Sequence, residues 1–207
     1  MMAWGNGIRN YNVDDALEQI NQSEYGAHHL IVYPELRVLR ELYTKYIRRQ
    51  LEHENKVVLL LPHYESADKI RKVLSDRFLA TEKTAADNDD NTSIDVKKYE
   101  DEGSFIVMDS LKARFGINNH MAFLKQLLRK AEDSSKNGVS IIADCGSFLH
   151  LNNTDKLIEH ELSMPSQLDI NLKRFCVFHK QDFNRLTEDQ RQKLVNHHGQ
   201  VLVVEDE

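Results

Sequence analysis

The chain of 207 residues contains no glycine-rich phosphate-binding loop, because neither G-x-x-x-x-G-K-[ST] nor G-x-G-x-x-G occurs in it. Such a loop needs glycines so that backbone N–H groups can approach the phosphates, and a lysine to meet their charge. At the first predicted strand-to-helix junction, "HHLIVYPELRVL" (28–39), Pro34 and Glu35 make the turn, and the Glu35 carboxylate would repel a phosphate. These absences argue against ATP hydrolysis, while nucleotide binding by another mode stays open.

Cysteine is scarce as well. The two cysteines, Cys145 and Cys176, cannot form a disulfide framework, and each lies in or next to an apolar run, as a buried thiol would. The close metal-ligand spacings His-x-x-x-His, His-Glu-x-x-His and Cys-x-x-Cys are absent. We therefore expect no structural zinc site and no other cofactor. A metal site assembled from distant residues stays open, for example from His29, His63, His179 and Cys176.

The chain also lacks a strongly basic region and a long apolar run. Its formal net charge is −6, and direct nucleic-acid binding needs a basic footprint. No run approaches the ~20 apolar residues that a membrane span needs, and the N-terminal residues have no apolar segment of a secretory signal. We expect a cytoplasmic protein that binds neither nucleic acid nor a membrane directly.

What the sequence does contain is an alternation of short apolar runs and helical patterns. The runs are almost wholly apolar, as in strands of a parallel sheet that are buried on both faces. The predicted strands are 28–33, 56–62, 104–109, 139–144, 174–179 and 200–205. The predicted helices are 36–54, 66–77, 119–136, 154–163 and 187–198. This order predicts a three-layer α/β fold with a mostly parallel sheet flanked by helices. Residues 26–207 form one predicted domain, residues 1–25 an N-terminal arm with a helix at 13–22, and residues 81–93 a loop.

Polar side chains follow these strands, at the edge where parallel sheets bind their ligands. Asp144 ends an apolar strand, as a magnesium-coordinating Asp does in a P-loop ATPase, although an Asp here also serves as a turn former or N-cap. Glu65 is either a functional carboxylate or a first-turn residue favoured by the helix dipole. The other residues expected at this edge are Tyr33, Pro34, Glu35, His63, Tyr64, Asp109, Ser110, Cys145, His179, Lys180 and Asp182.

Several segments, taken in order, resemble one family. They are "HLIVY" (29–33), "KVVLLLPHYESADKIRKVL" (56–74), "NGVSIIAD" (137–144), "IEHEL" (158–162), "FCVFHKQDF" (175–183) and "LVNHHGQVL" (194–202). Together they resemble the MEDS sensory domain, named for methanogens, methylotrophs and the dichloromethane regulator, which is regarded as a P-loop-less relative of KaiC/RecA-like ATPases. Phe178 and His179 depart from the pattern, where a Tyr-Asp-like pair is usual.

The resemblance implies a RecA/KaiC-like fold without a Walker A loop and a non-catalytic sensory or signalling function. It implies a small organic ligand in a degenerate nucleotide cleft, and leaves open a signalling partner and a homo-oligomer. The candidate ligand-binding residues are His29, Tyr33, Tyr64, Glu65, Asp144, Cys176 and His179.

Two alternatives stay open at this point. The first is a metal-dependent enzyme whose catalytic set is Glu65, Asp144 and His179. The second is a protein-interaction module that uses the apolar stripe of the helix 36–54, although such a stripe also fits against the chain's own sheet.

Overall fold

The computed structural model describes residues 8–76, 93–117, 120–167 and 170–205. Within these residues, seven strands form one sheet in the order β1-β7-β2-β6-β5-β3-β4, and every neighbouring pair is parallel. The strands are β1 (Ile8–Tyr11), β2 (His28–Tyr33), β3 (Val57–Leu61), β4 (Phe105–Val107), β5 (Val139–Asp144), β6 (Leu172–His179) and β7 (Gln200–Val204). The predicted fold class, a three-layer α/β fold with a parallel sheet, is confirmed.

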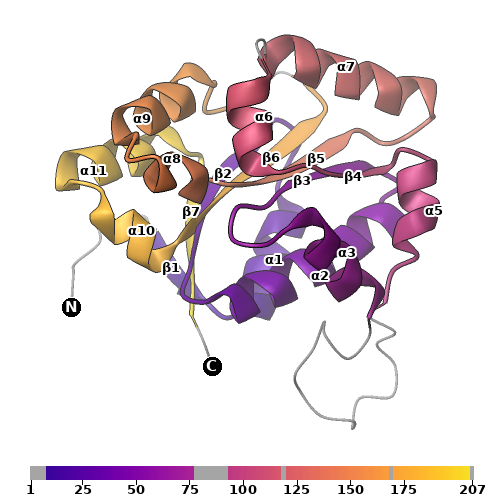
Figure 1. The fold of residues 1–207 in the computed structure, drawn as a ribbon, viewed down its shortest axis with the longest axis horizontal. Helices are drawn as coiled ribbons and strands as arrows, with labels where there is room; N and C mark the ends of the chain where they lie inside the picture. Colours follow the sequence, from indigo (N-terminus) through magenta and orange to yellow (C-terminus); the bar gives the residue numbers. More distant parts are fainter. Residues whose placement is uncertain (1–7, 77–92, 118–119, 168–169, 206–207) are drawn as a thin grey trace, which may run out of the picture.

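Helices cover both faces of the sheet (Figure 1). On one face lie α1 (Val13–Gln22), α2 (Leu36–Glu52), α3 (Ala67–Ser75) and α5 (Val96–Asp101). On the other lie α6 (Ser110–Gly116), α7 (His120–Asp133), α8 (Gly146–His150), α9 (Thr154–Ser163), α10 (Lys180–Arg185) and α11 (Glu188–His197). Successive strand residues supply alternate faces. Leu30 and Val32 pack under α8 to α11, whereas Ile31 and Tyr33 pack under α1 and α2.

The apolar stripe of α2 faces its own sheet. Leu39, Leu42, Tyr43 and Ile47 are buried in the core between α2 and the strands, and Leu36 packs against that core. The stripe is therefore accounted for by folding, and it gives the interaction-module alternative no support.

The predicted N-terminal arm needs a correction. Residues 8–11 pair with β7 as an edge strand, and α1 packs against α2. Asn12 caps α1 by accepting a hydrogen bond from the backbone N–H of Asp15 at 2.8 Å. Residues 8–22 therefore belong to the domain. The run "IRNY" escaped prediction because it is too polar to read as a buried strand. The predicted loop at 81–93 lies almost wholly outside the described residues.

The strand order places a topological switch point between β2 and β6. The chain leaves β2 for α2 on one face and leaves β6 for α10 and α11 on the other face. Tyr33 and His179, the last residues of these two strands, are partners in the register. Open α/β sheets bind ligands in the crevice at such a point. Among the described residues, no helix combines the length and apolarity that crossing a bilayer requires.

From the packing of α1 we predict how a substitution in this helix changes the free energy of unfolding. Ile20 is buried against the core, and its truncation to alanine leaves a cavity. We expect Ile20→Ala to lower the free energy of unfolding by about 2–4 kcal/mol in urea denaturation. Glu18→Ala, on the exposed side of the same helix, is the control and should change it by less than about 0.5 kcal/mol. Equal, small effects would show that residues 8–22 are not integral to the domain.

Candidate functional site

The carboxyl edge of the sheet brings together five of the seven predicted ligand-binding residues. At its centre, Tyr33 donates a hydrogen bond to Asp144 at 3.0 Å. The backbone N–H of Gly146 donates to the other oxygen of Asp144 at 2.8 Å. Burial raises the pKa of Asp144 to about 6, against the lowering effect of these two hydrogen bonds and of Arg114. Both oxygens of the Asp144 side chain are therefore engaged in hydrogen bonds that join β5 to β2 and to the start of α8.

Glu65 is held by an ion pair at the same edge. The guanidinium of Arg40 contacts both carboxylate oxygens, at 2.7 to 3.1 Å, and Tyr43 donates to Oε2 at 3.4 Å. Lys69 lies 3.3 Å from the same carboxylate. A two-pronged arginine–carboxylate pair is among the stronger polar contacts in proteins. Glu65 is therefore a structural anchor between α2 and α3, with little freedom to act as a general base.

The remaining residues of the edge form an aromatic group. Tyr64 donates a hydrogen bond to Asp182, and the ring of His179 lies 5.4 Å from that of Tyr33 and 5.7 Å from that of Tyr64. Burial lowers the pKa of His179. Its Nδ1 accepts a hydrogen bond from the backbone N–H of Gln181 and so caps α10. The imidazole serves a structural role at this position.

Little space is left in the predicted nucleotide cleft. The cavity lined by Tyr64, Glu65 and Asp144 has a volume of about 20 Å³. One water molecule needs roughly 10–15 Å³ measured in this way. In this structure the edge is filled by its own side chains.

His29 and Cys176 do not join the five residues at the edge. The ring of His29 lies 5.9 Å from that of Phe175, on the face covered by α1 and α2. Neither of its ring nitrogens has a hydrogen-bond partner among the described residues, and burial lowers its pKa to about 4. Cys176 lies on the opposite face of the sheet. The predicted set is therefore split across the sheet.

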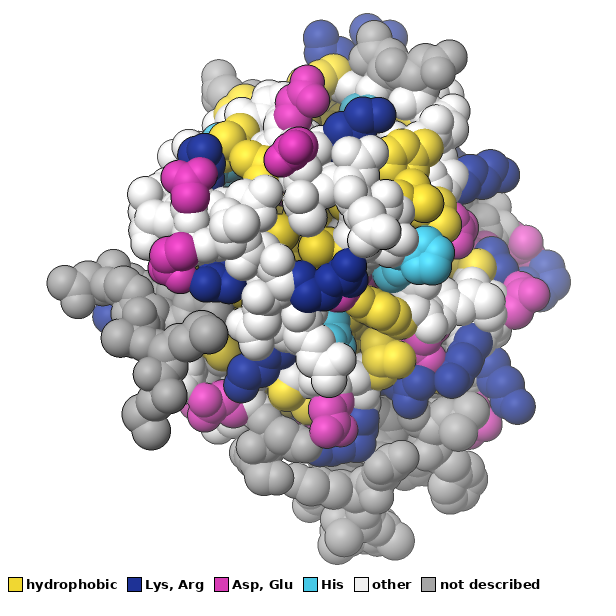
Figure 2. All heavy atoms as spheres, turned by 60° about the vertical axis from the view of Figure 1, so that its left-hand side comes forward, with side chains coloured by type: hydrophobic (Ala, Val, Ile, Leu, Met, Phe, Trp, Pro, Cys, Tyr) yellow, Lys and Arg dark blue, Asp and Glu magenta, His cyan; other side chains and the backbone are white. Residues whose placement is uncertain are grey.

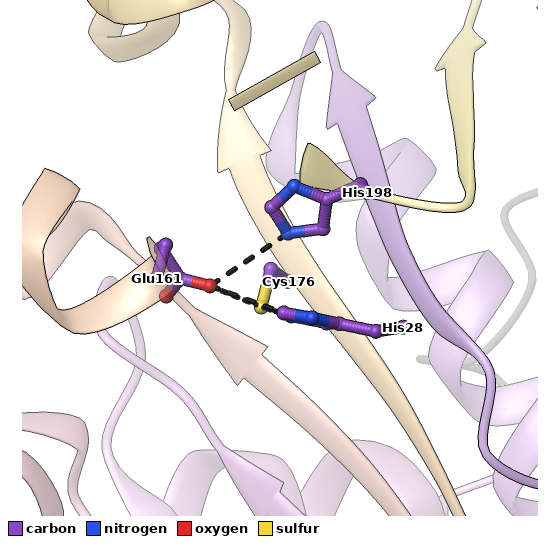
Figure 3. Close-up of side chains that lie close together, drawn as sticks. All are labelled: His28, Glu161, Cys176 and His198. Atoms are coloured by element: carbon purple, nitrogen blue, oxygen red, sulfur yellow. Dashed lines mark hydrogen bonds and ion pairs between the residues drawn. The ribbon is translucent and has the colours of Figure 1, made fainter. Parts of the chain in front are cut away.

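Cys176 belongs instead to a second group of polar side chains, buried under α9 and α11 (Figure 3). This group, the buried cluster, consists of His28, Glu161, Cys176 and His198. His28 opens β2, Glu161 lies on α9, Cys176 is in β6, and His198 is the C-cap of α11. One ligand atom from each lies within 4.8 Å of all the others.

Three members of the buried cluster were not singled out from the sequence. The segments "IEHEL" and "LVNHHGQVL" contain Glu161 and His198, but only as parts of the family resemblance. The prediction named His29, but its neighbour His28 is the residue that contacts Cys176. Successive residues of a strand point to opposite faces of the sheet, so only one of two adjacent imidazoles can reach Cys176.

Two arginines stabilise the charge in the buried cluster. Arg174 and Arg114 approach Oε1 of Glu161 at 3.3 and 3.6 Å. Burial raises the pKa of Glu161, but Arg174, the two histidines and Arg114 together outweigh burial and hold it well below its usual range. Burial lowers the pKa of His198, but Cys176 and Glu161 raise it to about 10. Burial raises the pKa of the other thiol, Cys145, as expected of an unreactive cysteine.

A second cavity lies beside the buried cluster, on the same face of the sheet. Its volume is about 50 Å³. Its walls are mainly apolar and come from β3, β5, α6 and α7, with Leu59, Leu61, Ile141, Ala113, Phe123 and Leu124 among them. Its polar side chains are Arg114, Arg174, His120 and His160. Arg114 is 7% exposed, and its Nε–H has no hydrogen-bond partner among the described residues.

The face of the molecule in Figure 2 shows acidic and basic side chains interspersed with apolar ones. On this face, neither charge gathers into an extended patch.

No family model and no curated protein matches this chain. Among solved structures, it is similar to the KaiC-like protein PH0186 from Pyrococcus horikoshii OT3, with 16% identity and a TM-score of 0.47. The match covers 74% of this chain and 61% of that protein, so this chain spans about three fifths of its length. The sheet order and the flanking helices define this chain as a three-layer α/β protein with an all-parallel sheet.

From the buried carboxyl of Asp144 we predict how the stability of the fold depends on pH. Its pKa rises from an ordinary value of 3.8 to about 6 on folding. The folded protein therefore binds this proton more tightly than the unfolded chain. The resulting stability is complete below pH ~4 and is lost as the pH rises through 6.

Asp144→Asn keeps the side chain uncharged at every pH. The free energy of unfolding of this variant minus that of the wild type should increase by up to about 3 kcal/mol from pH 4 to pH 7, because only the wild type loses stability as its carboxyl ionises. Urea denaturation at both pH values measures the difference. Asp155→Asn, which removes an exposed carboxylate of α9, should show no such gain. A pH-independent difference for Asp144→Asn would contradict the prediction.

Proposed function

We propose that this protein is a non-catalytic sensory domain of the MEDS type. It acts in the cytoplasm and binds a small organic molecule with an apolar body and one hydrogen-bond-accepting or anionic end. The observation that carries the proposal is the apolar cavity beside the buried cluster, together with the Nε–H of the buried Arg114, which has no hydrogen-bond partner in the described part of the chain. We assign the ligand site to this cavity beneath α6 and α7, in preference to the nearly filled space at the carboxyl edge of the sheet.

The apolar walls supply affinity and the arginine supplies orientation. Ligand pockets are typically apolar with a few placed polar groups, and burying apolar ligand surface contributes roughly 25 cal/mol per Å². The other two guanidinium nitrogens of Arg114 have partners. Nη2 lies 3.3 Å from both the carbonyl oxygen of Asp144 and Cys145 Sγ, and Nη1 lies 3.6 Å from the carboxylate of Glu161. A buried donor without a partner costs about 1–3 kcal/mol, which an acceptor on the ligand would offset.

The cavity limits the size of the ligand. Its volume of about 50 Å³ is roughly three to five times what one water requires. A molecule of a few non-hydrogen atoms fits it without rearrangement. Short-chain carboxylates, alcohols and haloalkanes belong to this class, whereas a nucleotide does not.

The position of the cavity gives a route for a signal. Arg114 and Arg174 line the cavity and also contact Glu161 on α9. A ligand that draws either guanidinium toward itself weakens its hold on Glu161 and changes how α9 packs. A signalling protein that contacts α9 would then distinguish the bound form from the free form.

The contacts of Glu65 and Asp144 at the carboxyl edge of the sheet favour this function over that of a metal-dependent enzyme. Glu65 is engaged by Arg40 and Tyr43, and Asp144 by Tyr33 and the Gly146 N–H. A catalytic metal needs carboxylates with free lone pairs around an open coordination position. Neither carboxylate offers this arrangement.

A variant in which a larger side chain fills the cavity tests whether the ligand binds there. Ala113 lines the cavity and is buried, so Ala113→Met places extra side-chain volume inside it. A thermal-shift screen of short-chain carboxylates, alcohols, haloalkanes and Mg-ATP identifies the ligand, because a molecule that binds only the folded state raises the Tm. We expect a shift from one of the small organic classes, and its loss in Ala113→Met.

Arg114→Met tests the polar contact and should weaken binding of the same ligand by about tenfold or more, the equivalent of one charge-assisted hydrogen bond. Lys112→Met, on the exposed side of α6, is the matched control and should bind like the wild type. Circular dichroism establishes that each variant is folded before titration. A Tm shift with Mg-ATP alone, or ligand binding unchanged in both cavity variants, would contradict the proposed function.

A further inference from the structure

The buried cluster has the composition of a metal site. Its four members offer two imidazole nitrogens, one sulfur and one carboxylate oxygen, and their side chains are shielded from solvent. We propose that His28, Glu161, Cys176 and His198 bind one zinc ion in a closed, four-coordinate site. This inference does not depend on the proposed function, because it rests on other residues and on the geometry of the cluster itself.

Three separations between the ligand atoms lie close to those around a tetrahedral ion. A fourth, 2.9 Å between Cys176 Sγ and Glu161 Oε2, is that of a hydrogen bond from the thiol and would lengthen when the ion replaces the thiol proton. Bond lengths of about 2.0–2.1 Å to nitrogen or oxygen and 2.3 Å to sulfur place neighbouring ligand atoms roughly 3.3–3.6 Å apart. His28 Nε2 lies 3.3 Å from Cys176 Sγ and 3.5 Å from Glu161 Oε2. His198 Nε2 lies 3.7 Å from the same carboxylate oxygen. Figure 3 shows the two rings, the thiol and the carboxylate pointing toward a common centre.

Both histidines are oriented by the nitrogen that faces away from the cluster. His28 Nδ1 lies 3.2 Å from the carbonyl oxygen of Pro165, and His198 Nδ1 lies 2.7 Å from that of Leu194. A carbonyl oxygen can only accept, so each Nδ1 carries a hydrogen and donates it. A metal-binding histidine typically donates its second nitrogen in this manner, which leaves the Nε2 lone pair for the ion.

Protons alone satisfy the cluster poorly. A hydrogen on Nε2 makes a ring a cation that can donate toward the carboxylate of Glu161. His198 Nε2 nevertheless lies 3.7 Å from Glu161 Oε2, which is too far for a hydrogen bond. His198 Nε2 is buried and has no hydrogen-bond partner among the described residues. A zinc ion bonded to all four atoms would satisfy each lone pair, and its binding to sulfur would release the thiol proton of Cys176.

Glu161 is supported as a metal-binding carboxylate should be. Its Oε1 faces Arg174 and Arg114, and its Oε2 faces the histidines and Cys176. The alternative to zinc is a metal-free ion network, in which the guanidiniums offset a carboxylate and a thiolate. The two states differ in metal content and in the spectrum of a bound transition metal, so they are separable by measurement.

A closed site of four protein ligands leaves no position for a substrate, so we assign it a structural role. The ion would join β2 and β6 to α9 and α11 in one bonded unit. Cysteine and imidazole ligands together select zinc over magnesium or calcium.

The test begins with the full chain, expressed without a histidine tag in zinc-supplemented medium and analysed for metal by mass spectrometry. We expect about one zinc per chain. After removal of zinc by a chelator, Co²⁺ should bind with tetrahedral d–d bands and a thiolate-to-cobalt charge-transfer band, and the chelator should lower the Tm of the wild type. Less than about a tenth of an equivalent of zinc, together with no cobalt spectrum, would establish the metal-free network. One equivalent of iron in its place would overturn the assignment of the ion.

Neighbouring residues supply matched control variants. Cys176→Ser should abolish the charge-transfer band, and His198→Gln should lose bound zinc. Cys145→Ser and His197→Gln change the same residue types outside the four ligands and should keep zinc and the cobalt spectrum. Cys145 Sγ lies 3.6 Å from Glu161 Oε1, and serine keeps a hydrogen-bond donor at that position. If either ligand variant fails to fold, the wild-type cobalt spectrum still decides, because cobalt bound without a thiolate band excludes Cys176. Equal loss of zinc in the ligand and control variants would overturn the site.

Discussion

The carboxylate of Glu161 is the buried charge on which the arrangement of one whole face of the sheet depends. Its side chain is fully shielded from solvent, and an unpaired carboxylate in such a place costs several kcal/mol. Arg174 from β6 and Arg114 from α6 meet it on one side, and His28 and His198 meet it on the other. Each partner comes from a different element. The need to pair one charge therefore fixes where α6, α9 and α11 sit against the strands.

The edge of the sheet is organised by a different constraint. Without glycines after β2, the backbone cannot turn to present its N–H groups to a phosphate. Tyr33 fills the space, and its hydroxyl binds Asp144, a buried carboxyl with a raised pKa. Glu65 is likewise neutralised by Arg40. Asp144 at the end of β5 and Glu65 after β3, both at the carboxyl edge of the sheet, thus serve as packing and anchoring groups. The apolar cavity beneath α6 and α7 lies on the opposite face of the sheet.

Much of the fold could be predicted from the sequence, because burial on both faces leaves continuous apolar runs. The limits of β2 and β5 and of the helices Val13–Gln22 and Thr154–Ser163 agree with prediction, and Thr187 caps α11 as its side chain predicts. The short helices α6, α8 and α10 were missed, since a helix of five to seven residues has too few turns to show periodicity. The edge strand β1 was missed because it is polar.

The sites were harder to predict than the fold. The side chains at the strand ends could be named, because a parallel sheet gathers those ends at one edge. Their interactions could not, since nothing local in the sequence reveals that Arg40 reaches Glu65 across a loop. The buried cluster draws single residues from two strands and two helices, so it has no spacing motif. In the pair His28-His29 only the alternation of the strand decides which imidazole belongs to it.

The cavity and the buried cluster share a boundary, and this gives the two proposals a common consequence. Arg114 and Arg174 line the cavity and hold Oε1 of Glu161, whose Oε2 faces His28, Cys176 and His198. A ligand that competes for a guanidinium changes the charge felt by the carboxylate, and so the strength with which Oε2 binds a cation. Coupling between two binding sites is reciprocal. An ion in the buried cluster would therefore alter ligand affinity in the cavity by the same factor, through a path of one carboxylate and two guanidiniums.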